Sequence, residues 1–204
     1  VRAVMEGMVI SGIAANYAGV SRPASGVEHY FSHVWDMRGL EFGTPVDLHG
    51  IQCGAAVLLS LKAYEYVRSL TPDREKALSC VRGFSFDSYC GFLRENMGAG
   101  AQAMIDGEYK EHKYDASKHQ KRLDIIINSW DKICAVIDEE LPPYEQVLDL
   151  LRSIGAPTSP TEFNITKEEI KNAFIITKDI RDKYVVTRLL WDLGELENAQ
   201  KTII

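Results

Sequence analysis

Three of the chain's five histidines, His29, His33 and His49, lie within one short stretch of the sequence. His29 and His33 are four residues apart, so on a helix they share one face, with about 5–6 Å between their Cβ atoms. His49 stands between a leucine and a glycine, at the start of the next apolar run. Neutral imidazoles that converge from two helix starts are ligands that divalent transition metals favour. The spacing therefore predicts a metal site, although helix-cap or core histidines bonded to backbone carbonyls would give the same pattern.

An acidic residue could complete such a site, because a catalytic zinc needs three protein ligands and one open position. Asp36 and Asp47 are the acids nearest to the three histidines, but both also fit a surface loop or a helix cap. The other two histidines, His112 and His119, lie in a polar stretch and are expected to be solvated. Two imidazoles alone would leave a divalent ion under-coordinated, so we expect weak metal affinity.

A phosphate site is predicted just before the histidines. Ser25 and Glu28 have the spacing of a capping box, which predicts a helix that starts at Ser25. A helix start exposes backbone N–H groups, and Arg22 adds a fork of N–H donors, so Arg22 and Ser25 could bind a phosphate together. A structural ion pair made by Arg22 is the alternative.

Composition and charge exclude several classes of protein. The chain has 204 residues, of which 46% are hydrophobic and 25% charged, as in a soluble globular protein with a sizeable core. A net charge of −6 argues against a nucleic-acid partner. No apolar run reaches the roughly 18 residues that span a bilayer, and no signal peptide is visible, so we expect a cytoplasmic protein with no membrane span. The four scattered cysteines predict reduced thiols rather than a zinc ribbon or a disulfide framework.

Sequence motifs of other catalytic and nucleotide-binding sites are absent or lie in the wrong structural context. Gly98 and Gly100 follow no strand, so they do not form a dinucleotide-binding loop. No Gly-x-Ser-x-Gly turn and no paired signature of a cysteine nucleophile occurs.

The apolar periodicity predicts a mainly α fold, a multi-helix bundle. Residues 48–70 are too apolar for a surface helix and are expected to form the central one, whereas residues 38–45 read as a loop. Residues 84–92 are ambiguous, and residues 184–187 alone have strand character. The other expected helices are residues 4–17, 25 onward, 73–81, 96–107, 116–141, 144–154, 166–182 and 185–193. Because the chain starts at Val1 within a helical pattern, we expect a piece of a longer protein.

Several segments resemble sn-glycerol-1-phosphate dehydrogenases, most closely the bacterial AraM-like branch. The longest is Arg-Pro-Ala-Ser-Gly-x-Glu-His-x-x-Ser-His, which ends at His33. The other matching segments are residues 11–14, 48–54, 155–157, 180–184 and 189–194. This family belongs with the iron-containing alcohol dehydrogenases, glycerol dehydrogenases and dehydroquinate synthases.

The resemblance implies that residues 1–204 are a dehydroquinate synthase-like helical C-terminal domain, and that an N-terminal domain that binds NAD(P) is absent from this chain. It implies hydride transfer between NAD(P)H with dihydroxyacetone phosphate and sn-glycerol 1-phosphate, a step in phospholipid biosynthesis. The metal, zinc or nickel, would be held by His29, His49 and an aspartate outside this chain. His33 would be catalytic and lie beside the substrate. The loop before His49 is a few residues longer than in archaeal members, so the chain departs from the family there.

If the resemblance holds, we expect this chain to be inactive on its own. We expect the substrate of the whole enzyme to be a small phosphorylated triose or polyol. A glycerol or other polyol dehydrogenase of the same superfamily is one alternative. A non-catalytic helical interaction module is another. Residue types do not decide the oligomeric state, and a homo-oligomer remains open.

Overall fold

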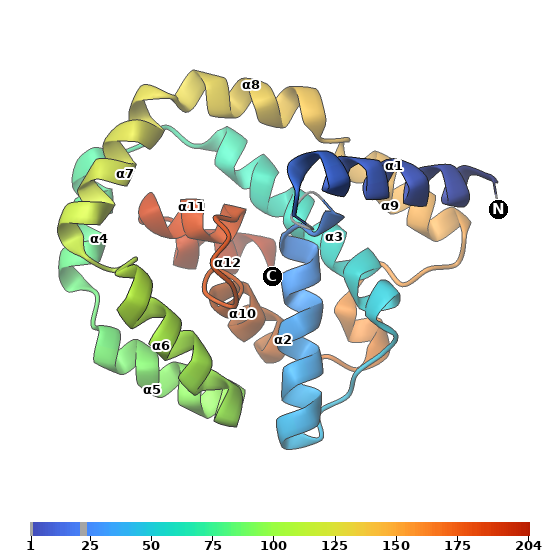
Figure 1. Cartoon of the computed structure of the whole chain (residues 1–204), viewed down its shortest axis with the longest axis horizontal. Helices are drawn as coiled ribbons and strands as arrows, with labels where there is room; N and C mark the ends of the chain where they lie inside the picture. The colour runs from blue at the N-terminus through green and yellow to red at the C-terminus, as the bar shows by residue number, and fades with distance from the viewer. Residues whose placement is uncertain (1, 21–23) are drawn as a thin grey trace.

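A computed structural model describes residues 2–20 and 24–204. The described residues form helices and connecting segments with no β-strand among them (Figure 1), which confirms the mainly α multi-helix bundle. The α-helices are α1 (Arg2–Ala18), α2 (Val27–Phe42), α3 (His49–Ser69), α4 (Arg74–Gly83), α5 (Phe86–Met97), α6 (Ala101–Glu111), α7 (Ala116–Asn128), α8 (Trp130–Glu140), α9 (Tyr144–Ser153), α10 (Lys167–Ile176), α11 (Val186–Asp192) and α12 (Leu196–Ile203). Two short 3₁₀ helices, η2 (Gly98–Gly100) and η3 (Pro160–Phe163), join them.

The predicted central helix is α3, which contacts α2, α8, α9, α11 and α12. It runs through the middle of the molecule in Figure 1. Its buried side chains occur on several faces, as expected for a helix surrounded by others. The start of α3 is therefore held by the core, and His49 is its first residue.

Helix α2 packs along α3 and has two faces with different roles. Phe31 and Trp35 are buried, and their rings contact those of Phe174 and Phe163 at centroid distances of 6.1 and 6.0 Å. These aromatic contacts fix the rotation of α2 about its axis, so its other face is turned toward the start of α3.

The ends of α2 differ from the sequence-based expectation. Gly26, not Ser25, is the N-cap residue, and the Glu28 carboxylate accepts the Gly26 N–H at 2.8 Å. The helix also extends into residues 38–45, which were expected to be a loop. It ends at Phe42, where Gly43 adopts the left-handed conformation (φ 67°), so only residues 43–45 of that segment lie outside the helix. Glycine tolerates this φ, so Gly43 rather than Gly39 ends the helix.

Two other expectations about the helices were wrong. Residues 116–141 form two helices rather than one, because Ser129, at φ −110° and ψ 12°, leaves the helical conformation between α7 and α8. The strand character of residues 184–187 is likewise not realised. Val186 and Thr187 lie in α11, which confirms the helix expected over residues 185–193, because packing against α3 outweighs their β-propensity. The ambiguous residues 84–92 lie mostly in α5, the helix expected to reach Asp182 ends at Ile176, and α12 was not predicted.

His119 is fully buried, so the expectation of a solvated surface histidine was wrong. Its Nε2 hydrogen bonds to the Asp192 backbone carbonyl at 2.8 Å, and its ring packs against Trp191. The residues next to His119 in the sequence are polar and suggested an exposed position, but α11 covers this histidine.

A cluster of buried charges lies between α6, α10 and α11. Lys178, Asp179, Arg188 and Glu108 are each at most 4% exposed. Asp179 accepts from Lys178 Nζ at 2.7 Å and is also bonded to Arg188. Because each charge has an opposite partner, the cluster joins these elements without leaving an isolated charge in the core.

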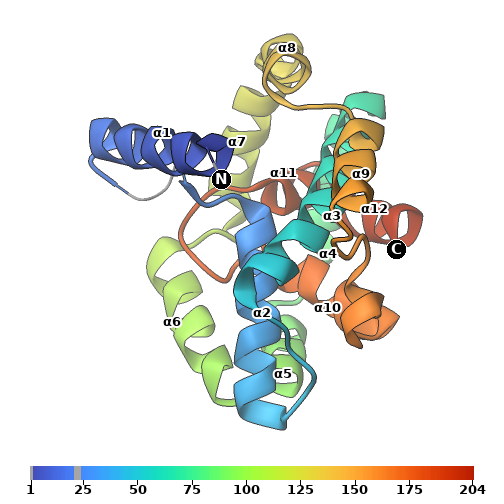
Figure 2. The ribbon, with the colours of Figure 1, turned by 90° about the vertical axis from the view of Figure 1, so that its right-hand side faces the viewer.

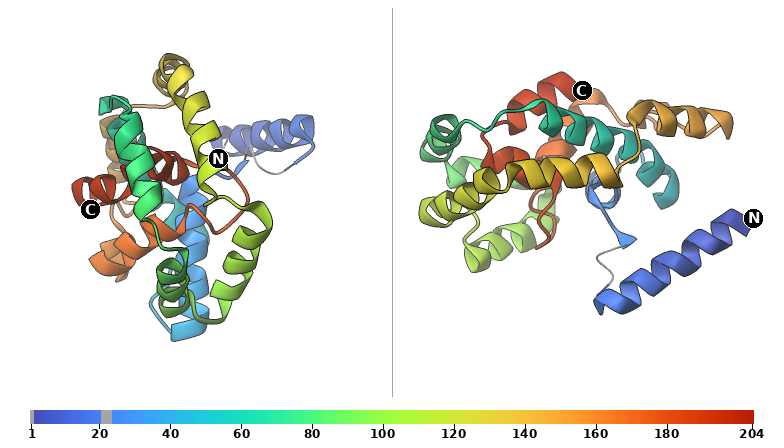
Figure 3. Two further views of the ribbon diagram at one scale, coloured as in Figure 1. Left: turned by 90° about the vertical axis from the view of Figure 1, so that its left-hand side faces the viewer. Right: turned by 90° about the horizontal axis from the view of Figure 1, so that it is seen from above.

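Helix α1 buries none of its side chains, although it is rich in apolar residues. Figures 2 and 3 show it extending away from the other helices. Its exposed apolar residues are Val4, Met5, Met8, Val9, Ile10, Ile13 and Tyr17. Across the described ranges, no helix combines the length and the apolar character needed to cross a bilayer.

Candidate metal centre

The three predicted histidines come together where α2 faces the start of α3. The ring centroids of His29 and His33 are 4.6 Å apart, those of His29 and His49 4.5 Å, and those of His33 and His49 5.4 Å. The first two lie on α2 and the third on α3, so the predicted convergence from two helix starts is confirmed.

The spacing of polar residues on α2 explains how the site is assembled. His29, Ser32, His33 and Asp36 follow the i, i+3, i+4, i+7 pattern of one helix face. That face is opposite the aromatic residues that hold α2 on the core.

Asp36 orients the imidazole of His49. Its Oδ2 lies 3.1 Å from His49 Nδ1, and because a carboxylate only accepts, Nδ1 carries the proton. The Ser32 hydroxyl also lies 2.8 Å from Nδ1. Gln52 in turn donates to Asp36 Oδ1 at 2.6 Å and to Ser32 Oγ at 3.1 Å. The lone pair of His49 Nε2 is thereby directed toward His29, as in carboxylate–histidine–metal sites.

The two nearest ring nitrogens have the separation that a metal requires. His49 Nε2 and His29 Nδ1 are 3.4 Å apart. Two nitrogens at about 2.0–2.1 Å from a tetrahedral zinc ion lie about 3.3–3.4 Å from each other. In the structure the two rings are hydrogen-bonded at this distance, and a divalent ion that replaced the bond would require no change in the separation.

Burial and neighbouring positive groups keep two of the histidines in the form that binds metals. Burial, followed by the proximity of His49, lowers the pKa of His29. Burial also lowers the pKa of His33, together with His29 and Arg181. Both imidazoles are thus neutral near pH 7, with a lone pair available for a ligand.

Of the two candidate acids, only Asp36 reaches the histidines, and it does so as the hydrogen-bond partner of His49. Asp47 accepts the Leu48 backbone N–H at 2.6 Å, but Leu48 is the N-cap residue of α3 and no side chain caps this helix, so Asp47 is not the helix cap that its position suggested. Cys53, which was not among the predicted site residues, has its Sγ within 4.8 Å of the ligand nitrogens of His29 and His49. The spacing of four residues between His49 and Cys53 on one helix could have indicated it.

The predicted phosphate site is described in part. Arg22 lies outside the described residues, so its prediction stays open. Ser25 does not cap α2, but its backbone carbonyl accepts a hydrogen bond from Lys183 Nζ. Lys183 and Arg181, for which no site role was predicted, help to lower the pKa of His29 and His33 respectively. Two positive charges therefore lie near the histidines and the start of α2.

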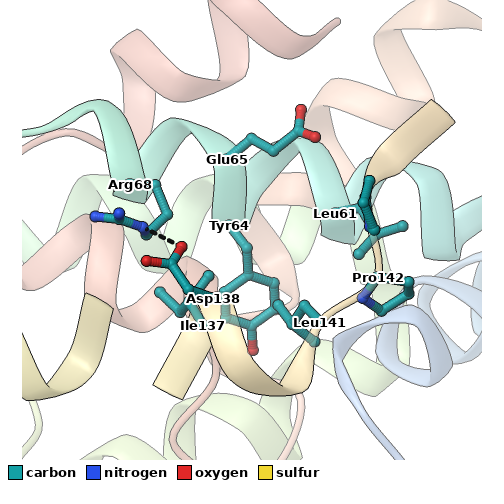
Figure 4. A pocket seen from close by; sticks show the side chains of 9 residues that line it. Leu61, Tyr64, Glu65, Arg68, Ile137, Asp138, Leu141 and Pro142 are labelled. Carbon is teal, nitrogen blue, oxygen red and sulfur yellow. Dashed lines mark hydrogen bonds and ion pairs between the residues drawn. The ribbon is translucent and has the colours of Figure 1, made fainter. Parts of the chain in front are cut away.

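A cavity of about 400 Å³ lies elsewhere, between α3 and α8 (Figure 4). Tyr64 lines it, and the ion pair of Arg68 with Asp138 stands at its edge with a 2.6 Å separation. Tyr64 is fifteen residues after His49 on the same helix, which is about 22 Å along the axis. The cavity is therefore separate from the histidine cluster.

Comparison with known proteins shows homologues in bacteria and archaea. The chain is 26% identical over all its 204 residues to a protein of Bacillus subtilis, and these residues correspond to 37% of that protein. It is 40% identical over 146 residues, 62% of the chain, to a protein of Halalkalibacterium halodurans, again 37% of the relative's length. A protein of Methanococcoides burtonii is 49% identical over 61 residues, 30% of this chain and 16% of the relative.

Each of these relatives is named glycerol-1-phosphate dehydrogenase, with NAD(P)+ in the name. The chain spans little more than a third of the length of the first two, and the matches lie in their C-terminal part. No protein-family model matches the chain.

Proposed function

Because the chain is homologous to the C-terminal part of glycerol-1-phosphate dehydrogenases, we propose that it is the metal- and substrate-binding part of such an enzyme. The reaction is reversible hydride transfer between NAD(P)H with dihydroxyacetone phosphate and sn-glycerol 1-phosphate. The observation that carries the proposal is the 3.4 Å separation of His29 Nδ1 and His49 Nε2, with His49 held by Asp36.

In this proposal His29 and His49 hold a zinc or nickel ion, since imidazole suits both metals. When bound, the ion acts as a Lewis acid that polarises the substrate carbonyl and stabilises the negative charge that develops on its oxygen. Asp36, Ser32 and Gln52 act through His49, by fixing its tautomer and the direction of its lone pair.

His33 has the position of a residue that faces the substrate. Its ring contacts both metal-binding imidazoles, yet its nitrogens are not among the set that could share one ion. A neutral imidazole there can bond to a substrate hydroxyl and exchange a proton with it.

The positive charges near the start of α2 support a phosphorylated substrate. Lys183 lies beside Ser25, and Arg181 acts on His33. With Arg22, they would attract the dianionic phosphate and orient the triose next to the histidines. The nicotinamide coenzyme would bind to the part of the relatives' length that this chain does not match.

The test uses the protein that contains this chain, assayed with dihydroxyacetone phosphate and NADH or NADPH. We expect turnover that requires a divalent metal and that His49→Ala abolishes together with bound metal. Arg22→Ala should raise the KM for the phosphorylated substrate. Full metal content and turnover in His49→Ala would refute the ligand assignment, and activity with free glycerol but not with its phosphate would identify a polyol dehydrogenase instead.

A further inference from the structure

The segment that joins α10 to α11 brings positive charges to the histidine cluster. These residues, 177–185, form turns and bends rather than a helix, and we call them the cationic arm. Lys183 Nζ donates a hydrogen bond to the Ser25 backbone carbonyl, just before α2. Arg181 lies close enough to His33 to help lower the pKa of that histidine. The cationic arm therefore passes beside the proposed substrate position.

The first end of the cationic arm is held by Asp179, which is buried. Its carboxylate accepts a hydrogen bond from the Tyr89 hydroxyl at 2.7 Å and another from the Tyr114 hydroxyl. The ion pairs with Lys178 and Arg188 hold the same carboxylate. Movement of Asp179 would leave donors and charges unpaired in the core, which is costly. The cationic arm thus starts from a fixed point.

The second end of the cationic arm is held through a tyrosine hydroxyl. Tyr184 is 50% exposed, but its hydroxyl donates to Asp192 Oδ2 at 2.8 Å. Asp192 is fully buried at the end of α11. Arg122, on α7, donates to both of its carboxylate oxygens at 3.0 and 2.9 Å. The half-exposed tyrosine is therefore bonded to a carboxylate that is itself fixed in the bundle.

Between these two ends, the cationic arm has more positive than negative charge, because Arg181 and Lys183 flank one acid, Asp182. Arginine and lysine each donate several N–H groups to phosphate oxygens. Long cationic side chains lose conformational freedom when they bind an anion, and a backbone that is already ordered reduces this cost. Tyr184 directly follows Lys183, so the bond of its hydroxyl restrains the backbone from which both cations extend.

We propose that Tyr184 is a positioning residue that keeps Arg181 and Lys183 in place for the phosphate of the substrate. Held by Asp192, its hydroxyl does not touch the substrate and acts through the backbone of the cationic arm. The inference rests on the proposed function and adds to it a residue that sets the affinity for the phosphate group. It concerns substrate binding and leaves the metal site unchanged.

The test is steady-state kinetics of the protein that contains this chain, with dihydroxyacetone phosphate and NADH or NADPH. Tyr184→Phe removes the hydroxyl and keeps the ring. It should raise the KM for dihydroxyacetone phosphate about 3–10-fold, with kcat and metal content within about twofold of the unsubstituted protein. Tyr109→Phe is the matched control, since Tyr109 is exposed and lies outside the cationic arm, and it should change none of these values. An unchanged KM in Tyr184→Phe, or a fall in kcat together with loss of metal, would overturn the inference.

A double-substitution cycle determines whether Tyr184 acts through the two cations. In a protein that already carries Arg181→Ala and Lys183→Ala, Tyr184→Phe should have no further effect on KM. The full effect of Tyr184→Phe in that background would overturn the positioning role.

Titration calorimetry with inorganic phosphate separates the inference from the proposed function, because it needs no turnover. Tyr184→Phe should weaken phosphate binding by the same factor by which it raises KM. Turnover of dihydroxyacetone phosphate with equal phosphate affinity in the two proteins would overturn the inference and leave the proposed function standing. Phosphate binding that Tyr184→Phe weakens, in a protein without turnover, would overturn the proposed reaction and support the role of Tyr184.

Discussion

At the scale of single residues, the site depends on the direction in which His49 points. Its Nδ1–H is bonded to Asp36, and Asp36 is held by Gln52, which is fully buried. The buried Gln52 side chain therefore holds Asp36 in place, and Asp36 in turn holds the imidazole of His49, although that imidazole is itself exposed. This chain of bonds explains why a histidine at the first residue of a helix can serve as an ordered ligand.

Asp36→Asn should weaken metal binding by about 10–100-fold, because the amide no longer fixes the tautomer of His49. Asp47→Asn is the matched control, since Asp47 lies two residues before His49 but bonds only to a backbone N–H. Competition of each variant with a chelator for zinc gives the affinities. Equal affinities of the two variants would show that Asp36 does not orient the ligand.

At the same scale, the sequence predicted the histidine cluster but not the residues that hold its imidazoles in place. The spacing of His29 and His33 and the position of His49 were sufficient to bring the three together. Gln52 was missed because its role depends on how α3 is rotated against α2. That rotation is set by core contacts such as Phe31 with Phe174, which lie far apart in the sequence.

At the scale of helices, local signals were reliable where a cap is made by neighbouring side chains. Thr166 and Glu169 form the predicted capping box of α10, with the Glu169 carboxylate accepting the Thr166 N–H at 2.9 Å. The box predicted at Ser25 does not form, because Glu28 bonds instead to Gly26. The division of residues 116–141 at Ser129 also escaped prediction, since both halves have the apolar periodicity of one helix.

The buried charge cluster gives a prediction at this scale. Asp179→Asn should reduce the free energy of unfolding by about 3–5 kcal/mol, because it leaves the Lys178 charge in the core without its carboxylate partner and Arg188 with Glu108 alone. Asp138→Asn is the control, since its exposed pair with Arg68 contributes about 0–1 kcal/mol. Urea unfolding measures both variants, and similar small losses would mean that the cluster is solvated or neutral.

At the scale of the whole molecule, the described residues divide into a packed bundle and the exposed helix α1. The apolar periodicity of residues 4–17 correctly predicted a helix, but not that its apolar side chains would be exposed. The spacing of apolar residues shows that one face of a helix is apolar. It does not show whether another part of the protein packs against that face.

Ile10→Glu should therefore change the unfolding free energy of this chain by no more than about 0.5 kcal/mol, since Ile10 is 66% exposed. Phe31→Ala, in the core at 1% exposure, should cost about 3–5 kcal/mol. Thermal and urea unfolding of the two variants measure the contrast. A loss of several kcal/mol in Ile10→Glu would mean that α1 packs on the bundle.

The most direct test of the account is X-ray absorption spectroscopy of the zinc-loaded chain, which counts imidazole ligands through their outer-shell scattering. We predict two imidazoles per zinc ion, reduced to one in His29→Ala and in His49→Ala and unchanged in His112→Ala. A spectrum without imidazole scattering, or one that neither substitution at His29 nor at His49 alters, would contradict the metal centre on which the proposed function depends.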